Sequence, residues 1–466
     1  MPGRLEAIFA ALVTALARTD GSAWLVGGVP RDVLLGAPSE DVDVVTSANP
    51  MSLAGALRAE FGASVAALPR SVRVAFARSD GEVALQMDIA PLRGERIEDD
   101  LRERDYTVNA MALPIHSWRD ALLPSRDDGP AALSGLLDPL GGREDLARRR
   151  LRLAGEQSLR RDPGRIVRGA RLIARFQLEP TPETLALAWE AAPMLDTLPP
   201  DRLPFEMNLL LAASGCADGL AFLRDCGALA RLLPTLASDA RAAHALACMR
   251  QTERLQEAEP RGEAEQAVFA PDAPLRAWYA AALPSGLSRL VALRWGLLLH
   301  AETTHEPPLD DVESPSVIGP ASLIRTLSPA ARSIAYGIEA RACFTARMLA
   351  VHEPDERDLR RLFALAGEET VDVLTAAAIC ATALAADGQR EEDEARVVAE
   401  RARAIVALYF ADRARLIPPP LLTGGDLIQE LGAQPGPAIR RLLERVREAQ
   451  IEGDVATHAE ALALAR

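Results

Sequence analysis

The sequence is poor in the residues that build disulfide frameworks and soft-metal sites. It has five cysteines and six histidines among 466 residues, and the histidines form no cluster along the chain. The cysteines show no paired metal-ligand spacing, so we expect buried thiols in a reducing compartment. These absences exclude a disulfide-rich secreted domain and predict no metal site made of cysteines. The cysteines are Cys216, Cys226, Cys248, Cys343 and Cys380.

Long apolar runs and an excess of positive charge are also missing. No signal-peptide core or membrane-spanning run is present, which predicts a cytoplasmic protein without membrane contact. The net charge of −14 argues against a nucleic-acid partner only if charge is evenly spread. Between Arg143 and Arg175 there are eleven arginines against four acidic residues. RNA phosphates are therefore expected to bind there.

The chain is long enough for roughly three domains. Up to about residue 115 it mixes strands and helices, and SVRVAFARSD followed by GEVALQMDIA predicts a hairpin turned at Asp80-Gly81. After Gly142 the apolar spacing is helical. Loops are predicted at Glu257–Pro274 and His305–Val317, and a boundary at Ile417–Leu421.

The segment from Ala23 to Asn49 carries the clearest chemical pattern. Its carboxylates Asp41 and Asp43 are two residues apart in a strand-like run, so both lie on one face. Carboxylate oxygens are the ligands that Mg²⁺ prefers, and the remaining positions are left for water and substrate phosphates. Asp88, on the second hairpin strand, is the natural third carboxylate.

A glycine pair precedes these carboxylates. Gly27 and Gly28 form a turn after an apolar strand, which lets backbone N–H groups approach an anion. Arg31 adds a guanidinium suited to bidentate phosphate contact. Together with the carboxylates, this pattern predicts nucleotidyl transfer from a triphosphate.

Five motifs follow one another between Trp24 and Phe176, namely LVGGVPRDVLLG, DVDVVT, LRERDYTVNAMAL, LDPLGGREDL and RDPGRIVRGARLIARF. In this order they resemble those of the class II tRNA nucleotidyltransferases, the family of CCA-adding enzymes and bacterial poly(A) polymerases. Two weaker matches to the family follow in PPDRLPFEMNLLLA and LLTGGDLIQELGAQPGPAIRRLLERV.

The resemblance implies an α+β fold. A polymerase-β-like head with a mixed sheet at 1–140 would be followed by a helical neck at 141–235. A helical body at 236–415 and a tRNA-binding helical tail at 416–466 would complete the chain. The implied substrates are CTP, with ATP as a further candidate, and the 3′ acceptor end of tRNA, with Mg²⁺ bound by Asp41 and Asp43.

The resemblance also implies roles for individual residues. Asp41, Asp43 and Asp88 would be the catalytic carboxylates, and Gly27, Gly28 and Arg31 would hold the triphosphate. Residues that would contact the nucleotide's phosphate and ribose are Arg104, Asp105 and Asn109. On a predicted helix from Arg161 to Arg175, Asp162 and Arg165 would pair with the incoming base, while Arg168 and Arg171 would contact phosphates.

Three departures from the family pattern bear on specificity. Arg161 stands where the family has glutamate, and Gly164 and Gly169 replace better helix formers, which suggests a looser segment. Complete CCA-adding enzymes carry a flexible segment before the motif that contains Arg104. Here MDIAPLRG passes almost directly to ERIEDDLRERD, which resembles CC-adding enzymes.

Other functions stay open. The chain could be a complete CCA-adding or A-adding enzyme, or a poly(A) polymerase. Helices around His244 and His300 resemble those of HD-domain phosphohydrolases, but Ala301 stands where an aspartate ligand is required, which favours a degenerate domain. An RNA-binding protein without catalysis is disfavoured because the carboxylates and arginines of the motifs are present together.

Overall fold

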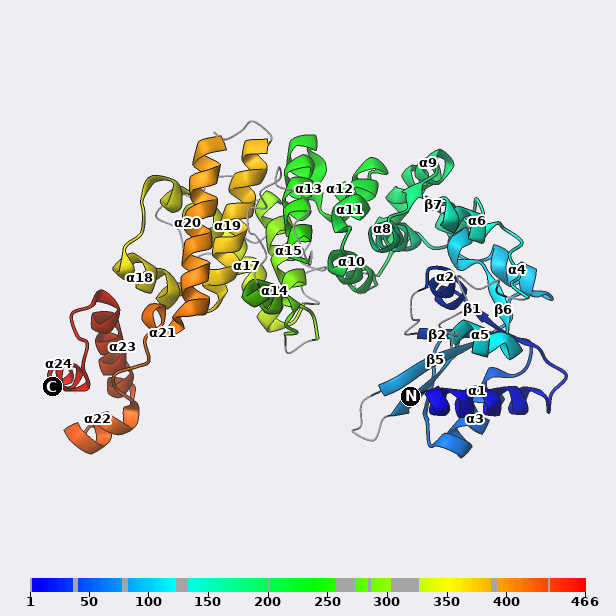
Figure 1. Cartoon of the computed structure of the whole chain (residues 1–466), viewed down its shortest axis with the longest axis horizontal. Coiled ribbons are helices and arrows are strands. Elements are labelled where there is room, and N and C mark those ends of the chain that lie inside the picture. The colour runs from blue at the N-terminus through cyan, green and yellow to red at the C-terminus, as the bar shows by residue number, and fades with distance from the viewer. Residues whose placement is uncertain are drawn as a thin grey trace. The chain divides into compact units, whose positions relative to one another are not determined.

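A computed structural model describes residues 2–36, 41–77, 83–122, 133, 135–199, 202–256, 273–283, 286–302, 327–386, 392–434 and 436–466. The chain forms two compact units (Figure 1). Unit 1 comprises Met1–Leu198 and Asp225–Ala228, and unit 2 comprises Pro199–Arg224 and Leu229–Arg466. The finer division into head, neck, body and tail stays a prediction. Among the described residues, no helix is both long and apolar enough to cross a membrane.

Unit 1 is built on a six-stranded mixed sheet with the order β3-β4-β5-β2-β1-β6. Strands β2 and β5 are parallel, and the other neighbours are antiparallel. The α+β fold and the β4-β5 hairpin are confirmed, while the predicted turn at Asp80-Gly81 lies outside the described residues. The strands are β1 (Ala23–Val26), β2 (Asp41–Thr46), β3 (Ser64–Ala67), β4 (Val72–Ala77), β5 (Val83–Pro91) and β6 (Ala112–Pro114).

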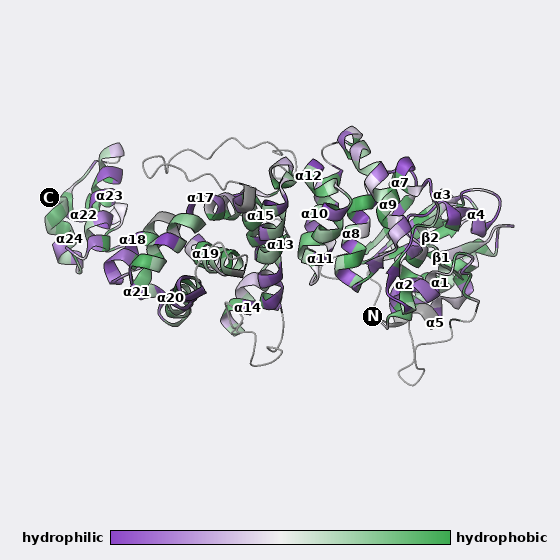
Figure 2. Ribbon diagram, turned by 90° about the horizontal axis from the view of Figure 1, so that it is seen from above, coloured by the Kyte–Doolittle hydropathy of each residue, from purple (hydrophilic) through white to green (hydrophobic). Residues whose placement is uncertain are grey.

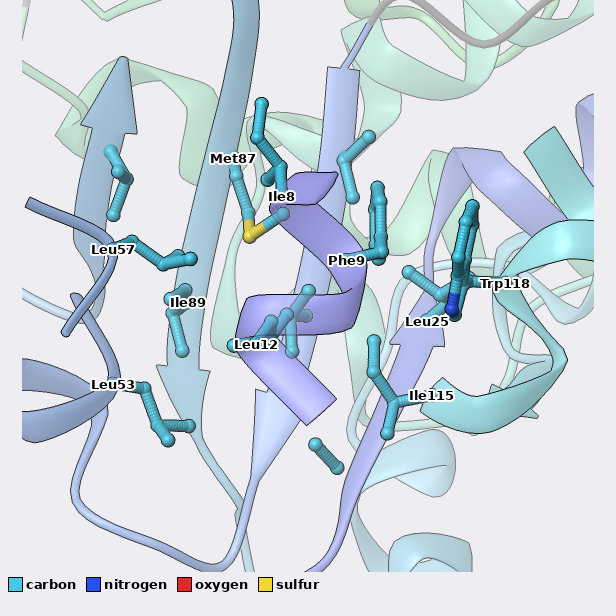
Figure 3. Close-up of a cluster of buried hydrophobic side chains, with 14 of the residues drawn as sticks. Ile8, Phe9, Leu12, Leu25, Leu53, Leu57, Met87, Ile89, Ile115 and Trp118 are labelled. Carbon is cyan, nitrogen blue, oxygen red and sulfur yellow. The ribbon is translucent and has the colours of Figure 1, made fainter. Parts of the chain in front are cut away.

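Helices α1 (Pro2–Leu16) and α3 (Pro50–Phe61) cover one face of this sheet. Figure 3 shows their apolar side chains packed against those of the strands, and the rings of Phe9 and Trp118 stack at 5.1 Å. Helix α3 starts at Pro50 because Asn49 accepts hydrogen bonds from the next free backbone N–H groups. This layer fixes which face of each strand is available for a site.

The opposite face packs against α4 (Ile97–Arg102), through Val26, Val45 and Leu101. Val42 and Val44 of β2 point to the α1 and α3 layer. Because side chains alternate along a strand, Asp41 and Asp43 belong to the face on which α4 packs.

The remaining elements of unit 1 lead from the sheet into a helical segment. They are α2 (Gly28–Leu34), η1 (Thr107–Asn109), η2 (Ile115–Ser117), α5 (Trp118–Leu122), α6 (Gly142–Ala147), α7 (Ser158–Arg161), α8 (Arg165–Phe176), α9 (Pro182–Ala191) and η3 (Ala192–Thr197).

Two predictions for this segment are wrong in detail. It is not purely helical, because β7 (Arg150–Leu151) pairs in parallel with β8 (Glu179–Pro180). Strands of two residues are too short to give a periodic signal. The single helix expected from Arg161 to Arg175 is two helices, since α7 ends at Arg161 and α8 begins at Arg165. Asp162 is extended, as residues before proline usually are.

Unit 2 is helical, and the helices show distinct apolar and polar surfaces (Figure 2). Helices α15, α17, α19 and α20 pack against one another, and α22, α23 and α24 share a separate small core. The elements are α10 (Leu203–Ala212), α11 (Cys216–Asp225), α12 (Ala228–Leu232), η4 (Pro234–Ala237), α13 (Asp239–Glu253), η5 (Arg254–Gln256), α14 (Ala273–Ala280), α15 (Arg289–Glu302), α17 (Pro329–Val351), α18 (Glu356–Ala366), α19 (Glu369–Ala386), α20 (Glu392–Ala411), α21 (Arg413–Leu416), α22 (Gly424–Leu431), α23 (Pro437–Glu452) and α24 (His458–Ala465), of which α11 and α12 extend into unit 1.

Residues Ile417–Leu421 are non-helical, but they lie within unit 2, so a domain boundary there stays a prediction. The predicted loop at His305–Val317 lies outside the described residues, as does most of the one at Glu257–Pro274. The end predicted for the second loop is wrong by two residues, because Ala273 and Pro274 already belong to α14.

Candidate active site

The carboxylates predicted to bind metal lie near the centre of the sheet. Asp43 on β2 is in register with Val26 of β1 and with Asp88 of β5. Residues paired across neighbouring strands are about 4.8 Å apart, so Asp43 and Asp88 are side by side. Asp41 lies two residues before Asp43 on β2, where it pairs with Gln86 of β5. The side chain of Asp41 lies outside the described part of the structure.

The glycine turn closes over Asp43. Gly27 has φ +68°, a conformation that favours glycine. A Cβ at this position would lie 2.6 Å from Oδ2 of Asp43 and 3.5 Å from Nη1 of Arg104. Only glycine therefore lets the carboxylate and the guanidinium approach the turn together.

Arg31 lies one helical turn further on, and its side chain is buried. Its Nε and Nη2 donate to Oδ1 of Asp32 at 2.8 and 2.7 Å, and Nη1 donates to Oδ1 of Asn109 at 2.5 Å. The guanidinium also lies 4.3 Å from the ring centroid of Phe176. Burial lowers the pKa of Arg31, although Asp32 opposes this shift. The structure thus fixes this arginine through internal contacts beside the glycine turn.

Asp105 connects the motif at 101–113 to α8. It accepts hydrogen bonds from Tyr106 N at 2.8 Å, Asn109 Nδ2 at 3.3 Å and Arg168 Nη1 at 3.3 Å. Burial by itself raises the pKa of Asp105, but Arg168 and the hydrogen bonds outweigh it, so the pKa lies below the ordinary value. Asp105 is therefore held as a buried carboxylate.

The position of Arg104 depends on Asp100, which the sequence reasoning missed. Asp100 is fully buried and accepts hydrogen bonds from Nε of Arg104 at 3.1 Å and from Nε of Arg93 at 2.8 Å. The sequence does indicate this contact, because a spacing of four residues places Asp100 and Arg104 on one side of a helical turn.

Arg165, predicted to pair with a base, contacts the backbone of the preceding motif. Its Nη1 donates to Arg104 O at 3.0 Å and Ser158 Oγ at 2.7 Å, and its Nη2 donates to Glu103 O at 3.0 Å. Oδ1 of Asp162 accepts from Gly164 N at 3.1 Å. Asp162 and Arg165 therefore flank the start of α8, directly after the helix break.

Arg161 forms an ion pair with Glu103, and both side chains are about half exposed. Arg161, which stands where the family has glutamate, therefore has an acidic partner close by. Gly169 also has a structural reason, because a Cβ there would lie 2.1 Å from Oη of buried Tyr106, which donates to Arg165 O at 2.8 Å. Gly169 therefore permits close packing, and the expectation of a looser segment stays a prediction.

Asp88 has a partner of its own. Arg73 on β4 donates to both of its carboxylate oxygens at 2.8 Å. Asp88 is thus beside Asp43 and also ion-paired, so a catalytic role and a structural role remain to be separated by experiment. Arg171, on α8, is half-buried one turn after Arg168.

Every basic residue in the chain is arginine, because the 52 Lys and Arg residues include no lysine. Guanidinium groups bind phosphate in a bidentate manner and stack on aromatic rings and bases. At this site the arginine guanidinium groups also donate most of the hydrogen bonds between side chains and the rest of the protein. The internal contacts of Arg31, Arg104, Arg165 and Arg168 organise the same surface that the motifs predicted for a nucleotide.

Hydrogen bonds in unit 1 connect four of the predicted residues, Arg31, Asn109, Asp105 and Arg168, while Asp43 lies at the glycine turn beside Arg104. This combination of a mixed-sheet head and an arginine-rich helix is that of nucleotidyltransferases. A family model described as Poly A polymerase head domain matches residues 23–152. Models described as Probable RNA and SrmB- binding site of polymerase A and tRNA nucleotidyltransferase domain 2 match residues 176–239 and 407–465.

Comparison with known proteins agrees with these models. An A-adding tRNA nucleotidyltransferase of Deinococcus radiodurans is 31% identical over 462 residues, which cover 95% of this chain and 94% of the relative. A CC-adding tRNA nucleotidyltransferase of Geobacter sulfurreducens is 38% identical over 208 residues, 44% of each chain. The chain belongs to the tRNA nucleotidyltransferase and poly(A) polymerase family.

The extent of similarity differs between relatives. The chain aligns with only about half the length of several curated relatives, including the Geobacter protein. The crystal structure of a Bacillus stearothermophilus CCA-adding enzyme in complex with CTP has a TM-score of 0.60 and 22% identity, covering 100% of this chain and 97% of that one. This likeness establishes the fold.

Proposed function

We propose that this protein transfers nucleotides from a nucleoside triphosphate to the 3′ end of tRNA. The observation that carries the proposal is the approach of Asp43 to Gly27, where a Cβ would displace the Asp43 carboxylate. That arrangement leaves a carboxylate, a backbone turn and the guanidinium of Arg104 around one point. Membership of the family supports tRNA as the acceptor.

The carboxylates fit a divalent metal such as Mg²⁺, because the set offers oxygen ligands only. Asp41 and Asp43 would hold it, with Asp88 as neighbour. When bound, a metal of this kind lowers the pKa of an attacking hydroxyl and stabilises a pyrophosphate leaving group. The chain's own residues supply the rest of the mechanism.

Those residues position the reactants. The backbone at Gly27 and Gly28 would follow the triphosphate, and Arg104 would contact its phosphates from across the turn. Arg31 and Asn109 hold each other at 2.5 Å, and Asn109 also donates to Asp105. This hydrogen-bond chain would fix the side chains that contact the ribose. Asp162 and Arg165 would contact the base, with Arg168 and Arg171 near phosphates.

We further propose that the enzyme adds only part of the CCA sequence, namely CC. The connector between β5 and α4 spans only residues 92–96. Leu92 N donates to Thr46 O at 2.8 Å, and Arg93 N donates to Asp100 Oδ1 at 3.3 Å. A connector this short and tied at two points is a poor candidate for the flexible segment of complete CCA-adding enzymes.

A second candidate is addition of the terminal A. The similarity to the A-adding protein of Deinococcus radiodurans extends over 95% of the chain, whereas the CC-adding protein of Geobacter sulfurreducens matches over 44%.

The test is extension of tRNA transcripts at single-nucleotide resolution. Transcripts ending before CCA and after CC are incubated with Mg²⁺ and CTP, ATP or both. Addition of two C residues to the first transcript, with no A, supports CC addition. Addition of A to the second transcript alone supports the second candidate, and addition of all three residues rejects partial addition.

A variant separates catalysis from RNA binding. Asp43→Asn should lose transfer and retain tRNA affinity, whereas exposed Asp20→Asn should retain both. Affinity is measured by filter binding over a salt series, in which it should fall as salt rises. Normal transfer by Asp43→Asn would reject the proposed site, while a complete absence of tRNA binding by the wild type would reject the proposed substrate.

A further inference from the structure

Four helices of unit 2 bring together thiol and imidazole groups that are far apart in the sequence. His244 and Cys248 lie one turn apart on α13, and Cys380 lies on α19, which packs against α13. The ligand atoms of these three side chains all lie within 4.8 Å of one another. Sγ of Cys248 is 3.6 Å from Nε2 of His244.

A second imidazole and a third thiol extend this group. His300 on α15 is within hydrogen-bonding reach of Cys380 and of Cys343 on α17. Sγ of Cys343 is 3.6 Å from Nε2 of His300. The two histidines, Cys248 and Cys380 are buried, whereas Cys343 is exposed. Cys343 therefore marks the side from which solvent reaches the group.

The spacing of the cysteines and histidines along the sequence shows no metal-ligand pattern, but the fold brings three of them together in this region. Cys248 and Cys380 are separated by more than a hundred residues, so no local spacing reveals them. Packing of α13 against α19 and α15 creates the group. The expectation that all cysteines are buried is also wrong for Cys343.

The separation of His244 and Cys248 suits a tetrahedral zinc ion. Zinc binds thiolate sulfur at about 2.3 Å and imidazole nitrogen at about 2.0 Å, which at tetrahedral angles places the two ligand atoms about 3.5 Å apart. The Cys248 to His244 separation of 3.6 Å agrees with this value. The set contains no carboxylate, so it favours a soft metal over Mg²⁺.

We propose that His244, Cys248 and Cys380 form the core of a structural zinc site that joins α13 and α19, and that His300 of α15, which lies beside Cys380 but outside this group of three, moves in as the fourth ligand. Two thiolates and two neutral imidazoles would neutralise Zn²⁺, so binding leaves no net charge in the helical core. A closed set of four protein ligands is typical of structural sites rather than catalytic ones. The site is distinct from the carboxylates of unit 1 and does not depend on the proposed function.

Zinc binds the thiolate, so metal binding to the reduced protein must release protons. That release provides a readout independent of enzyme activity.

The experiment uses the reduced full chain. We expect about one zinc per chain by elemental mass spectrometry after loading and desalting. Substitution with Co²⁺ should give a thiolate-to-cobalt charge-transfer band and the d–d bands of a tetrahedral site. Cys380→Ser should lose the zinc and the spectrum, while Cys216→Ser, a buried control that contacts none of these ligands in the described structure, should retain both.

Two results would overturn the proposal. One is a folded wild-type chain that takes up neither zinc nor cobalt in the reduced state. The other is a zinc content that Cys380→Ser and His244→Gln leave unchanged, which would place the metal elsewhere. If Cys380→Ser does not fold, the wild-type cobalt spectrum and proton release during titration decide the question without a variant.

Discussion

Arg31 and Asn109 lie 78 positions apart and are joined by a 2.5 Å hydrogen bond from Nη1 to Oδ1. The bond connects the helix that follows the glycine turn to the motif that contains Asp105. Because Asn109 also donates to Asp105, which is bound by Arg168, two sequence motifs and α8 share one polar network. A shift of either motif or of α8 would therefore change the hydrogen bonds of the other two.

Gly169→Ala should destabilise unit 1, because its Cβ would lie 2.1 Å from Oη of buried Tyr106. Overpacking of this kind costs about 1–3 kcal/mol in free energy of unfolding. Gly55→Ala is the matched control, since it lies in helix α3 with open space around its Cβ. The control should be neutral or gain up to about 1 kcal/mol. Urea unfolding measures both, and equal stability would show that Tyr106 moves aside.

Gly27→Ala should abolish most nucleotide transfer, since its Cβ would displace the Asp43 carboxylate. Gly62→Ala is a milder control, because Gly62 has φ +65° and ψ 23°, in the left-handed helical region, and its Cβ meets open space. It should cost about 1–2 kcal/mol of stability. Gly27→Ala should cost more, because φ +68° with ψ −120° lies outside that region, in a conformation suited to glycine. We expect Gly27→Ala alone to transfer nucleotides about 100-fold more slowly, which corresponds to an activation free energy about 2.7 kcal/mol higher. Similar transfer rates in the two variants would argue against the site.

Variants of Arg73 and Asp88 should reveal what Asp88 does. If Asp88 is a third catalytic carboxylate, Asp88→Asn loses transfer while Arg73→Met retains it. Both changes should alter the free energy of unfolding by less than about 1 kcal/mol, because the pair is partly exposed. Transfer rates and urea unfolding are measured in parallel. Matching, small effects of both variants would make Asp88 a structural partner only.

Asp372 should make unit 2 less stable as pH rises. Burial raises its pKa to about 7, although Arg289 at 2.9 Å opposes the shift. In the unfolded chain the group ionises near pH 4, so between about pH 4 and 7 the folded state holds more protons. The free energy of unfolding therefore falls across this range and levels off above it. Asp372→Asn should remove this component, and an unchanged slope in urea unfolding would contradict the assignment.

The sequence by itself determined the α+β head, the hairpin of β4 and β5, and the placement of Asp43 in a strand after a glycine turn. Each of these depends on local rules, namely alternation along strands and the conformational freedom of glycine. The ordered motifs determined the family. Local rules also located the non-helical segment at Ile417–Leu421, where three prolines prevent a helix.

Only the tertiary structure decided how distant residues meet. The role of Asp100, the packing of Gly169 on Tyr106 and the ion pair of Arg161 with Glu103 depend on contacts between elements that the sequence does not order in space. The same holds for Cys248 and Cys380, which lie far apart along the chain and become neighbours because α13 packs on α19. Periodicity fixes which face of a helix is apolar, but not which other helix that face meets.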